Sequence, residues 1–404
     1  MKILVINAGS SSLKYQFFDM DHETVLAKGN CDRIGIAGSA IKHKQLVKGV
    51  EYAKETPMKD HSDAMKAVIE ALTDTDHGCI TSMDEISAFG HRVVHGASYF
   101  AESIVATDEI IETIKACRDF APLHTDASLM GIKGCTEAMP GKPQVFVFDT
   151  AFHQTMPPEA YMYGVSYDMY EEYGIRRYGM HGTSHRYVSG EMIKLLDKPE
   201  EDTKIVTCHL GNGSSISAVK GGKVMDTSMG FTPLAGVIMG TRSGDFDPAM
   251  VTYIMEKKGF TPAEMNDYMN KKCGFSGLCG SSDCRDVEAA AKNGDKKAQL
   301  VLDMLAYQVT KYIGSYTAIM GGLDAIVFTA GIGENTPSIR QAIADRLAPF
   351  GVKLDEDVNA KARVQSNIVR LSTDDSAVKV YLIPTNEELV IARDTARLAK
   401  DLVK

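Results

Sequence analysis

Short apolar runs separated by small and polar residues mark the beginning of the chain. Residues 3–6 are continuously apolar, and residues 13–18 form a second run of strand length, which predicts two β-strands. The stretch from Asn7 to Lys14 is rich in small residues, and its Gly9 can take a positive φ. Backbone N–H groups in such a turn can hold an anion such as phosphate. The pattern therefore predicts either a phosphate-holding turn or an ordinary polar hairpin.

The same arrangement occurs again in the second half of the chain. Residues 205–219 contain an apolar run, then His209, a stretch of Gly and Ser, and a second strand-like run. Two further buried-type strands, 145–148 and 325–328, follow the two copies and end in polar or small residues. A pattern repeated at this scale indicates duplication. We expect an α/β protein with two duplicated domains that face each other across a cleft.

Helical spacing of apolar residues and nearby capping residues predict the helices. A long loop with many Gly and Pro residues is expected over 229–248, and a loop of that length usually has a functional reason. The expected helices are 62–71 with Ser62 as its cap, 108–120, 296–320 ended by Gly321 and Gly322, one that starts at Thr336 and Pro337, and a last one after Pro384.

The domain boundaries are predicted where polar and Pro-containing segments interrupt this pattern. Residues 149–158 form a plausible hinge, and the last helix is expected to pack back on the first domain. The prediction is an N-terminal domain of residues 1–150 plus 387–404 and a C-terminal, nucleotide-binding domain of residues 151–386.

Composition narrows the class of protein. The chain has 404 residues, 44% hydrophobic and 24% charged, and a net charge of −9, which argues against a general nucleic-acid or anionic-membrane surface. No run reaches membrane length and no signal-peptide pattern precedes the first strand, so a cytosolic protein is expected. The eight cysteines form no C-x-x-C pair and are expected to be free thiols. The P-loop, dinucleotide and protein-kinase motifs are absent.

Eight motifs rich in polar, basic and small residues occur along the chain, most of them beside an expected strand. They are Asn7–Lys14, Gly90–Gly96, Phe148–His153, Tyr178–His185, His209–Ser215, Thr241–Pro248, Gly331–Asn335 and Pro384–Glu388. With these motifs the chain resembles the acetate kinase family over essentially its whole length. That family belongs to the superfamily of sugar kinases, heat-shock chaperones and actin. The resemblance implies two actin-like, ribonuclease H-like domains around a nucleotide cleft, and a homodimer.

The resemblance also implies a reaction, the reversible transfer of the γ-phosphoryl group of ATP to acetate by direct in-line transfer. A guanidinium binds carboxylate or phosphoryl oxygens with two hydrogen bonds, so Arg92 and Arg242 suit this chemistry. His181 would donate a hydrogen bond to the phosphoryl group in transit. Asp149 would orient groups rather than act as a base, because acetate, with a pKa of about 4 to 5, is already ionised at pH 7.

Other site residues follow from the resemblance alone. His124 and His209 resemble site residues with lesser roles, and the expected metal is Mg²⁺, with Mn²⁺ as a substitute, near Asn7 and Glu387. The acyl pocket would be lined by Arg92, Val94, Leu123, Met180 and Pro233. The nucleotide, ATP or ADP, would contact Lys14, His209, Leu210, Gly211, Asn212, Gly213, Asp283, Cys284, Arg285, Gly331, Ile332, Gly333, Glu334 and Asn335.

The chain departs from the family pattern at Ala97, at Met180, and at Thr125 with Asp126. Because Met is flexible, Met180 can reshape the acyl pocket, which leaves the choice between acetate and propionate open. One alternative is therefore a propionate kinase. The alternative from another class of protein is an actin- or chaperone-like ATP-binding switch without acyl transfer. The partners expected are small substrates and a second copy of the chain, with no nucleic acid and no membrane.

Overall fold

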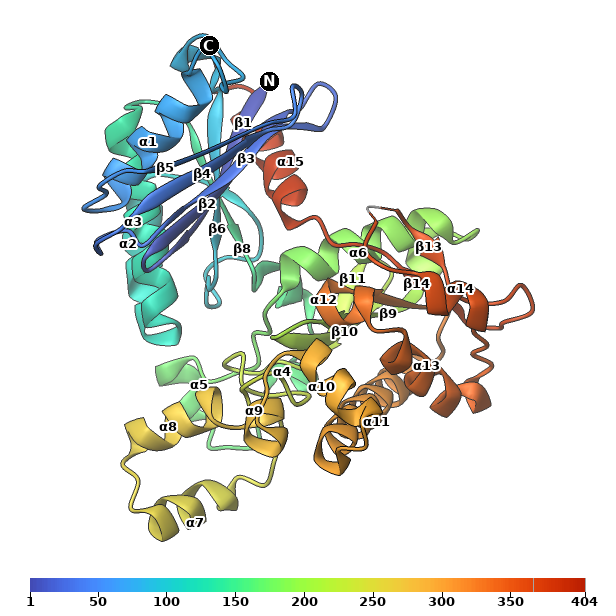
Figure 1. Cartoon of the computed structure of the whole chain (residues 1–404). Helices are drawn as coiled ribbons and strands as arrows, with labels where there is room; N and C mark the ends of the chain where they lie inside the picture. The colour runs from blue at the N-terminus through green and yellow to red at the C-terminus, as the bar shows by residue number, and fades with distance from the viewer. Residues whose placement is uncertain (366, 404) are drawn as a thin grey trace. The chain divides into compact units, whose positions relative to one another are not determined.

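The computed structural model describes residues 1–365 and 367–403 of the chain (Figure 1). The chain divides into two compact units, Met1–Phe152 with Asn386–Lys404, and His153–Thr385. This division lies beside residues 150 and 386, where the sequence places the domain boundaries. Within the described residues, no helix is both long and apolar enough to cross a membrane.

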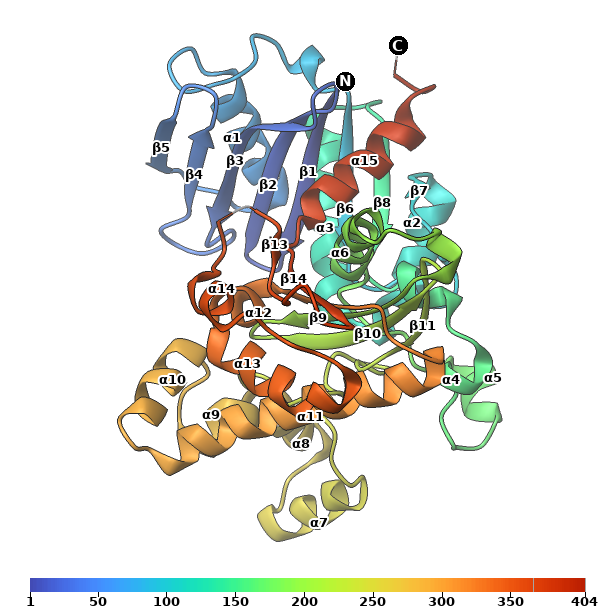
Figure 2. The ribbon, with the colours of Figure 1, turned by 90° about the vertical axis from the view of Figure 1, so that its right-hand side faces the viewer.

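The first unit is built on an eight-stranded mixed sheet in the order β5-β4-β3-β2-β1-β6-β8-β7. Helices α1 and α3 cover one face of this sheet, and α15 packs against β1, β6 and β8 on the other (Figures 1 and 2). The strands are β1 Lys2–Gly9, β2 Ser12–Asp19, β3 Thr24–Asp32, β4 Ala40–Gln45, β5 Val50–Glu55, β6 Ala88–Val93, β7 Ile104–Val105 and β8 Gln144–Phe148. The helices are α1 His61–Thr73, α2 Asp108–Ala116, α3 Pro122–Ala138 and α15 Glu387–Ala399.

The second unit is built on a six-stranded mixed sheet in the order β11-β10-β9-β12-β14-β13. Helix α6 packs on one face and the long helix α11 on the other (Figure 2). The strands are β9 Lys204–Leu210, β10 Ser214–Lys220, β11 Lys223–Thr227, β12 Ala325–Thr329, β13 Val369–Arg370 and β14 Lys379–Leu382. The helices are α4 Pro158–Tyr161, α5 Asp168–Tyr173, α6 Gly182–Leu195, α7 Ala249–Lys258, α8 Pro262–Lys271, α9 Gly274–Cys279, α10 Cys284–Lys292, α11 Lys296–Met320, α12 Ala330–Asn335, α13 Pro337–Arg346 and α14 Glu356–Lys361.

Five strands of each sheet share one topology. In the order β3-β2-β1-β6-β8, the first two pairings are antiparallel and the next two are parallel. The order β11-β10-β9-β12-β14 repeats the same directions. Because this is an agreement in strand order and direction, the predicted α/β class with a duplicated design is confirmed. In both units the parallel strands end where the predicted site motifs begin.

The first turn is tighter than the sequence suggests. Strands β1 and β2 continue through the motif, so Asn7 pairs with Lys14 and Gly9 pairs with Ser12 across the ladder. Gly9 can take a positive φ but does not do so, because it lies outside the left-handed region. Close approach is the constraint on Gly9, since a Cβ there would lie 2.7 Å from Oγ of Ser12.

Several predicted helix boundaries were wrong. The cap of α1 is Asp60, whose side chain accepts from the backbone N–H groups of Ser62 and Asp63. The helix predicted over 108–120 becomes 3₁₀ from Cys117, and the sequence did not predict α3. Helix α11 matches its prediction, including Gly321 at its end with φ of 71°. All eight cysteines are free thiols, as predicted.

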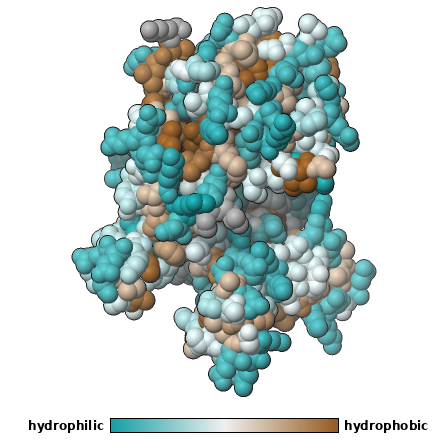
Figure 3. Space-filling view, turned by 90° about the vertical axis from the view of Figure 1, so that its left-hand side faces the viewer, coloured by the Kyte–Doolittle hydropathy of each residue, from teal (hydrophilic) through white to brown (hydrophobic). Residues whose placement is uncertain are grey.

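Each unit has its own main cluster of buried apolar side chains. One lies between the first sheet and α1, and the other surrounds α11 and the second sheet. On the face shown in Figure 3, exposed hydrophobic side chains form small separated patches among hydrophilic ones. Because each sheet packs on its own core, each sheet can hold the ends of its strands in place.

Candidate active site

Arg92, Asp149 and Glu387 form a charged cluster in the first unit. Arg92 lies on β6, Asp149 directly follows β8, and Glu387 begins α15. The guanidinium donates from Nε and Nη2 to Oδ2 of Asp149 at 3.1 and 2.5 Å, and Nε lies 3.8 Å from Oε2 of Glu387. The Asp149 side chain is 1% exposed, whereas those of Arg92 and Glu387 are 24% and 20% exposed. Arg92 is therefore held by a buried carboxylate and still reaches solvent.

The cluster changes how its members ionise. The negative charge of Asp149 is the main reason that the pKa of the Arg92 guanidinium is raised, so Arg92 stays a cation. Burial raises the pKa of Glu387 to about 7, with Asp149 and Glu388 adding to the rise and Arg92 opposing it. A carboxyl group that changes charge near neutral pH is a candidate functional group.

Asn7 and Lys14 lie beside this cluster on β1 and β2. They line a cavity of about 650 Å³ in the first unit, together with Glu388, the neighbour of Glu387. Val94 directly follows β6, and its side chain is partly buried. The side chain of Leu123 lies outside the described part of the structure. The structure thus brings the predicted carboxylate-binding Arg92 next to the predicted metal-binding Glu387, and it places Asn7 and Lys14 in one cavity with Glu388.

In the second unit, His181 precedes α6 with a left-handed backbone, φ 63°. Its Nδ1 lies 2.9 Å from Oγ of Ser215, and its ring stacks on His209 with 4.1 Å between centroids. Nδ1 of His209 in turn lies 2.8 Å from Oγ of Ser184. The left-handed conformation is uncommon for a residue with a Cβ, and such strain often occurs at functional sites.

Arg242 lies near His181. A Cβ on Gly213 would lie 3.3 Å from Nη1 of Arg242 and 3.6 Å from the His181 ring, so Gly213 lies between the two side chains. Nη1 donates to the carbonyl of Pro233 at 3.2 Å and approaches Sδ of Met239 at 3.6 Å. Burial lowers the pKa of Arg242, but the guanidinium stays protonated at neutral pH.

Met180 belongs to a small buried cluster with Met229 and Met239. Because Met239 also contacts Arg242, this cluster links the predicted acyl-pocket residue Met180 to the predicted catalytic arginine. Pro233 lies in the same loop as Arg242 and accepts its hydrogen bond.

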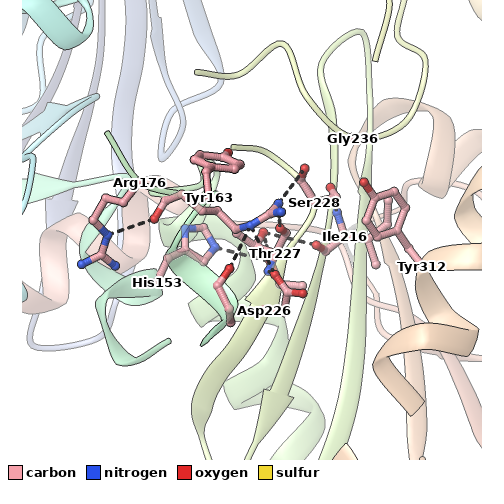
Figure 4. A network of polar contacts seen from close by, with 12 residues as sticks. His153, Tyr163, Arg176, Ile216, Asp226, Thr227, Ser228, Gly236 and Tyr312 are labelled. Carbon is pink, nitrogen blue, oxygen red and sulfur yellow. Dashed lines mark hydrogen bonds and ion pairs between the residues drawn. The ribbon is translucent and has the colours of Figure 1, made fainter. Parts of the chain in front are cut away.

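The loop of residues 229–248 is tied down by polar contacts at both ends. Figure 4 shows Thr227 and Ser228, at the end of β11, within a network that also contains His153 and Tyr312. Nη1 of Arg177 donates to the carbonyl of Thr227 at 2.7 Å. Further along, Oδ1 of Asp245 accepts from the N–H of Gly236 at 2.8 Å, and Oδ2 contacts the Tyr312 hydroxyl. These contacts close the loop around Arg242.

The predicted nucleotide residues gather around the turn at 211–213. A Cβ on Gly211 would lie 3.7 Å from Cβ of Ala330, at the start of α12. A Cβ on Gly240 would lie within 1.8 Å of Oδ1 of Asn212 and 3.1 Å of the Ser282 carbonyl. Since α12 carries residues 331–335 and Ser282 precedes Asp283, three predicted segments meet here.

The predicted nucleotide residues in these segments differ in the charge and hydrogen bonds that they can contribute. Asp283 caps α10 and also pairs with Arg285, whose Nη2 lies 2.5 Å from Oδ2. Cys284 is buried, and burial raises the pKa of its thiol to about 12, so it contributes packing rather than charge. Glu334 is also buried and accepts from the N–H of Ala330 at 2.8 Å. Asn335 donates to the carbonyl of Gly331 at 3.0 Å.

Sequence reasoning missed Arg340 on α13, which is fully buried. Its guanidinium donates to the carbonyls of Gly333 and Glu334 at 2.8 and 3.0 Å, and also to Asn359 and Ala362. Arg340 therefore holds the end of α12 in place. The sequence did not indicate that Arg340 is buried, because an arginine beside an apolar helix position such as Ile339 usually points to solvent.

Two α/β domains of the same topology, with an arginine–carboxylate cluster in one and a Gly-rich turn beside His and Arg in the other, define a two-domain phosphotransferase. The chain belongs to the acetokinase family, whose profile matches residues 2–393.

Relatives and solved structures agree with this assignment over the full length. The chain is 54% identical to an acetate kinase of Halothermothrix orenii over 401 residues, 99% of this chain and 100% of the relative. It is 56% identical to one of Thermoanaerobacter pseudethanolicus over 405 residues, all of both chains. The crystal structure of Porphyromonas gingivalis acetate kinase matches with a TM-score of 0.94 and 43% identity, covering 98% of this chain and 99% of that one. A propionate kinase from Francisella tularensis subsp. tularensis SCHU S4 matches with a TM-score of 0.90 and 39% identity, covering 98% and 99%.

Proposed function

We propose that this chain is an acetate kinase, which reversibly transfers the γ-phosphoryl group of ATP to acetate and yields acetyl phosphate and ADP. The observation that carries the proposal is the identity above one half, over the whole chain, with acetate kinases. Six of the eight site motifs lie at the ends of strands in the two sheets, where phosphoryl-transfer groups are expected.

Arg92 is the proposed carboxylate-binding residue. Its Nε and Nη2 point to Asp149, which leaves the rest of the planar donor fork for an anion. Asp149 orients this guanidinium and takes no proton from acetate, since a carboxylic acid with a pKa of about 4 to 5 is already ionised at pH 7. Two anions must approach each other in this reaction, so a fixed cation at the acceptor is the main requirement.

His181 and Arg242 are the proposed stabilising groups for the phosphoryl in transit. Both side chains flank Gly213, so donors from the loop of residues 229–248 and from α6 meet at the predicted phosphate turn. Transfer of this kind depends mostly on positioning and charge stabilisation. Lys14, the turn 209–213, residues 283–285 and residues 331–335 are proposed to hold the phosphates and the adenosine.

Mg²⁺ is the proposed metal, and the donor set fits it. The predicted ligands are the amide oxygen of Asn7 and the carboxylate of Glu387, both hard oxygen donors, with Mn²⁺ as a substitute. Mg²⁺ usually binds one or two protein oxygens together with water and substrate phosphates. The described residues contain no group of three or more His, Cys, Asp and Glu side chains that could hold a metal. When bound, the metal would neutralise phosphate charge.

Propionate is the second candidate acceptor. The observation that favours it is the cluster of three methionines around Met180, because flexible side chains can make room for one more methylene. A homodimer is also proposed from the family resemblance, and sedimentation of the purified chain would test it.

A hydroxamate assay with acetate, propionate and butyrate, each with Mg-ATP, tests the proposed function. Acyl phosphate from acetate supports it, and a higher kcat/KM with propionate would reassign the acceptor. ATP hydrolysis that no short acid affects, with no acyl phosphate formed, would replace the proposal with an ATP-binding switch. Reactions without metal and with Mn²⁺ complete the design.

A further inference from the structure

A buried chain of hydrogen bonds runs from His181 into the second unit. Nδ1 of His181 lies 2.9 Å from Oγ of Ser215, and the same Oγ lies 2.7 Å from Nε2 of His185. Nδ1 of His185 lies 2.7 Å from Oγ1 of Thr207. The side chains come from α6, β10 and β9, and Ser215, His185 and Thr207 are all fully buried. The contacts therefore form one path with no solvent between its members.

Counting protons shows that the two histidines are coupled. The Ser215 hydroxyl has one proton, so it can donate to only one of the two imidazoles, and an imidazole that does not accept this proton must donate to the Ser215 oxygen. Burial, with His153 and His209 adding to the effect, holds the pKa of His185 well below its ordinary value. His185 is therefore neutral and carries one ring proton. Fixing the tautomer of His185 thus fixes which nitrogen of neutral His181 carries its proton.

The direction of the chain follows from Thr207. Its hydroxyl donates to the carbonyl of Ser217 at 3.5 Å, so the oxygen accepts from Nδ1–H of His185. Nε2 of His185 is then an acceptor for the Ser215 hydroxyl. Ser215 in turn accepts from Nδ1–H of His181.

We propose that Thr207, His185 and Ser215 are positioning residues that keep the proton of neutral His181 on Nδ1. The consequence for catalysis rests on the proposed function. Nε2 of His181 then carries a lone pair, and it donates to a phosphoryl oxygen only after the ring takes a second proton. The site would act with an imidazolium, which has a net charge opposite to that of the phosphoryl group.

Titratable and charged groups of this unit face His181 from β9, from α6 and from the loop of residues 229–248. His209, from β9, stacks on the ring face, and His185 lies behind Ser215. Arg242, from the loop of residues 229–248, lies across Gly213. A cation opposite His181 disfavours the imidazolium, whereas a bound phosphate favours it. Proton uptake by His181 is therefore expected to accompany nucleotide binding.

Two substitutions at Thr207 separate this proposal from a packing role. Thr207→Val keeps the shape and the strand preference and removes the hydroxyl, whereas Thr207→Ser keeps the hydroxyl. The readout is the ring ¹⁵N chemical shifts of His181 in ¹⁵N-histidine-labelled protein, assigned by their loss in His181→Gln. The spectra are recorded at a pH where the ring is neutral.

We expect wild type and Thr207→Ser to carry the neutral proton on Nδ1 of His181. In Thr207→Val, His185 loses its acceptor at Nδ1, so the chain reverses and the His181 proton moves to Nε2. An Nε2-protonated His181 in the wild type would overturn the proposal, and so would one tautomer in all three folded proteins.

The pH profile of acetyl phosphate formation tests the catalytic consequence. In wild type and Thr207→Ser, kcat falls on the alkaline side in step with the His181 titration seen by NMR in the nucleotide-bound protein, with no change in KM for acetate. In Thr207→Val the neutral ring already has Nε2–H, so this alkaline loss becomes smaller. An equal alkaline loss in all three overturns the catalytic consequence. Absence of acetyl phosphate at every pH overturns the proposed function instead, and leaves the tautomer result standing.

Discussion

Arg92 and Asp149 join the ends of two parallel strands through a two-pronged ion pair. Nε of Arg92 lies 3.2 and 3.1 Å from the two carboxylate oxygens, and Nη2 lies 2.5 Å from Oδ2. The backbone N–H of Asp149 also donates to the carbonyl of Val93 at 3.0 Å. The carboxylate is thus fixed by the sheet, and it fixes the guanidinium. Any change in Asp149 should act through Arg92.

Asp149→Asn should lower kcat/KM for acetate by roughly 30-fold or more, because breaking a buried charge pair costs about 2–5 kcal/mol. If Asp149 only orients Arg92, the double variant with Arg92→Ala should be no worse than Arg92→Ala alone. Steady-state kinetics of the four proteins measures this. Asp126→Asn is the control, since its pair with Arg118 is exposed. Additive losses would give Asp149 a role of its own.

Glu387 should make the activity depend on pH. Its pKa is raised to about 7, so the carboxylate that would bind Mg²⁺ exists above that pH and is lost as pH falls through it. The apparent KM for Mg²⁺ should therefore rise between pH 7.5 and 6, about tenfold per pH unit once the carboxyl is protonated. Glu387→Gln should remove this pH dependence. Glu112→Gln, on the exposed face of α2, should keep it. If the apparent KM of the wild type for Mg²⁺ does not change with pH, Glu387 is excluded as the ligand.

The raised pKa of Glu387 should make stability change with pH in the direction opposite to activity. Between the ordinary value of 4.5 and about 7, the folded protein holds a proton on Glu387 that the unfolded chain has released. The unfolded state then binds fewer protons, so the free energy of unfolding falls as pH rises through this window. Denaturant titrations at pH 5 and pH 8 should show a smaller loss in Glu387→Gln than in the wild type.

Much of the fold could be predicted from local pattern. Both copies of the strand–turn–strand unit and the whole of α11 follow from apolar spacing and from Gly at the end of the helix. Helix α3 was not predicted, because its sequence has several small residues and a weak apolar stripe. Two of its glycines, Gly131 and Gly134, allow close packing on β1 and α1. Such a reason is tertiary and leaves no periodic signal.

The candidate site was predicted less completely than the fold. Motif residues at strand ends, such as Arg92 and Asp149, could be found because their position in the pattern is unusual. The residues that hold them could not. Thr207 looks like an ordinary strand position, and the motif that contains Ser215 did not indicate its partners, because these hydrogen bonds depend on side chains from other elements. Positioning residues become visible only when the elements are packed.

Arg242→Ala should lower kcat by about 100-fold or more, since removal of one donor to the transition state typically costs about 10²–10³. The fold should survive, because the protein contacts of the guanidinium are a carbonyl of Pro233 and the Met239 sulfur. Single-turnover kinetics and circular dichroism would measure both. Arg242→Lys should recover only part of the rate, because an ammonium cannot bind bidentately. Unchanged turnover in Arg242→Ala would remove it from the mechanism.

Asp245→Ala should lower kcat by about tenfold without abolishing it, because a misplaced catalytic group reduces the rate even when it is present. The carboxylate closes the loop through Gly236 and Tyr312, and Arg242 lies within that loop. Tyr312→Phe removes one of the two contacts and should lose less. Asp247→Ala, whose side chain only accepts from the N–H of Ala249 nearby, is the matched control. Equal losses in Asp245→Ala and Asp247→Ala would argue against the loop contact.

Met180→Ala should shift the preference from acetate toward propionate. If Met180 lines the acyl pocket, the shorter side chain leaves room for the extra methylene, which is worth about 1–3 kcal/mol in an apolar pocket. The ratio of kcat/KM values should change by about tenfold. Met229→Ala, in the same methionine cluster, tests whether loosening the cluster is sufficient. The same ratio change in both variants would assign the effect to the cluster rather than to the pocket.

Arg340→Met should destabilise the second unit and weaken nucleotide binding together. Its five hydrogen bonds end on Asn359, Gly333, Glu334 and Ala362, and every one of these contacts is buried. A methionine fills part of the volume but leaves several acceptors unpaired, each at a cost of about 1–3 kcal/mol. We therefore expect a loss of at least about 3 kcal/mol in the free energy of unfolding.

The end of α12 carries residues predicted to contact adenosine, and Arg340 holds the carbonyls of Gly333 and Glu334 there. The KM for ATP should therefore rise more than the KM for acetate. Arg346→Met is the matched control, because Arg346 lies on the same helix, is exposed, and donates only to Ala342 one turn before it. Urea titration followed by circular dichroism, with the two KM values, measures both effects. A stability loss with an unchanged KM for ATP would separate α12 from the nucleotide site.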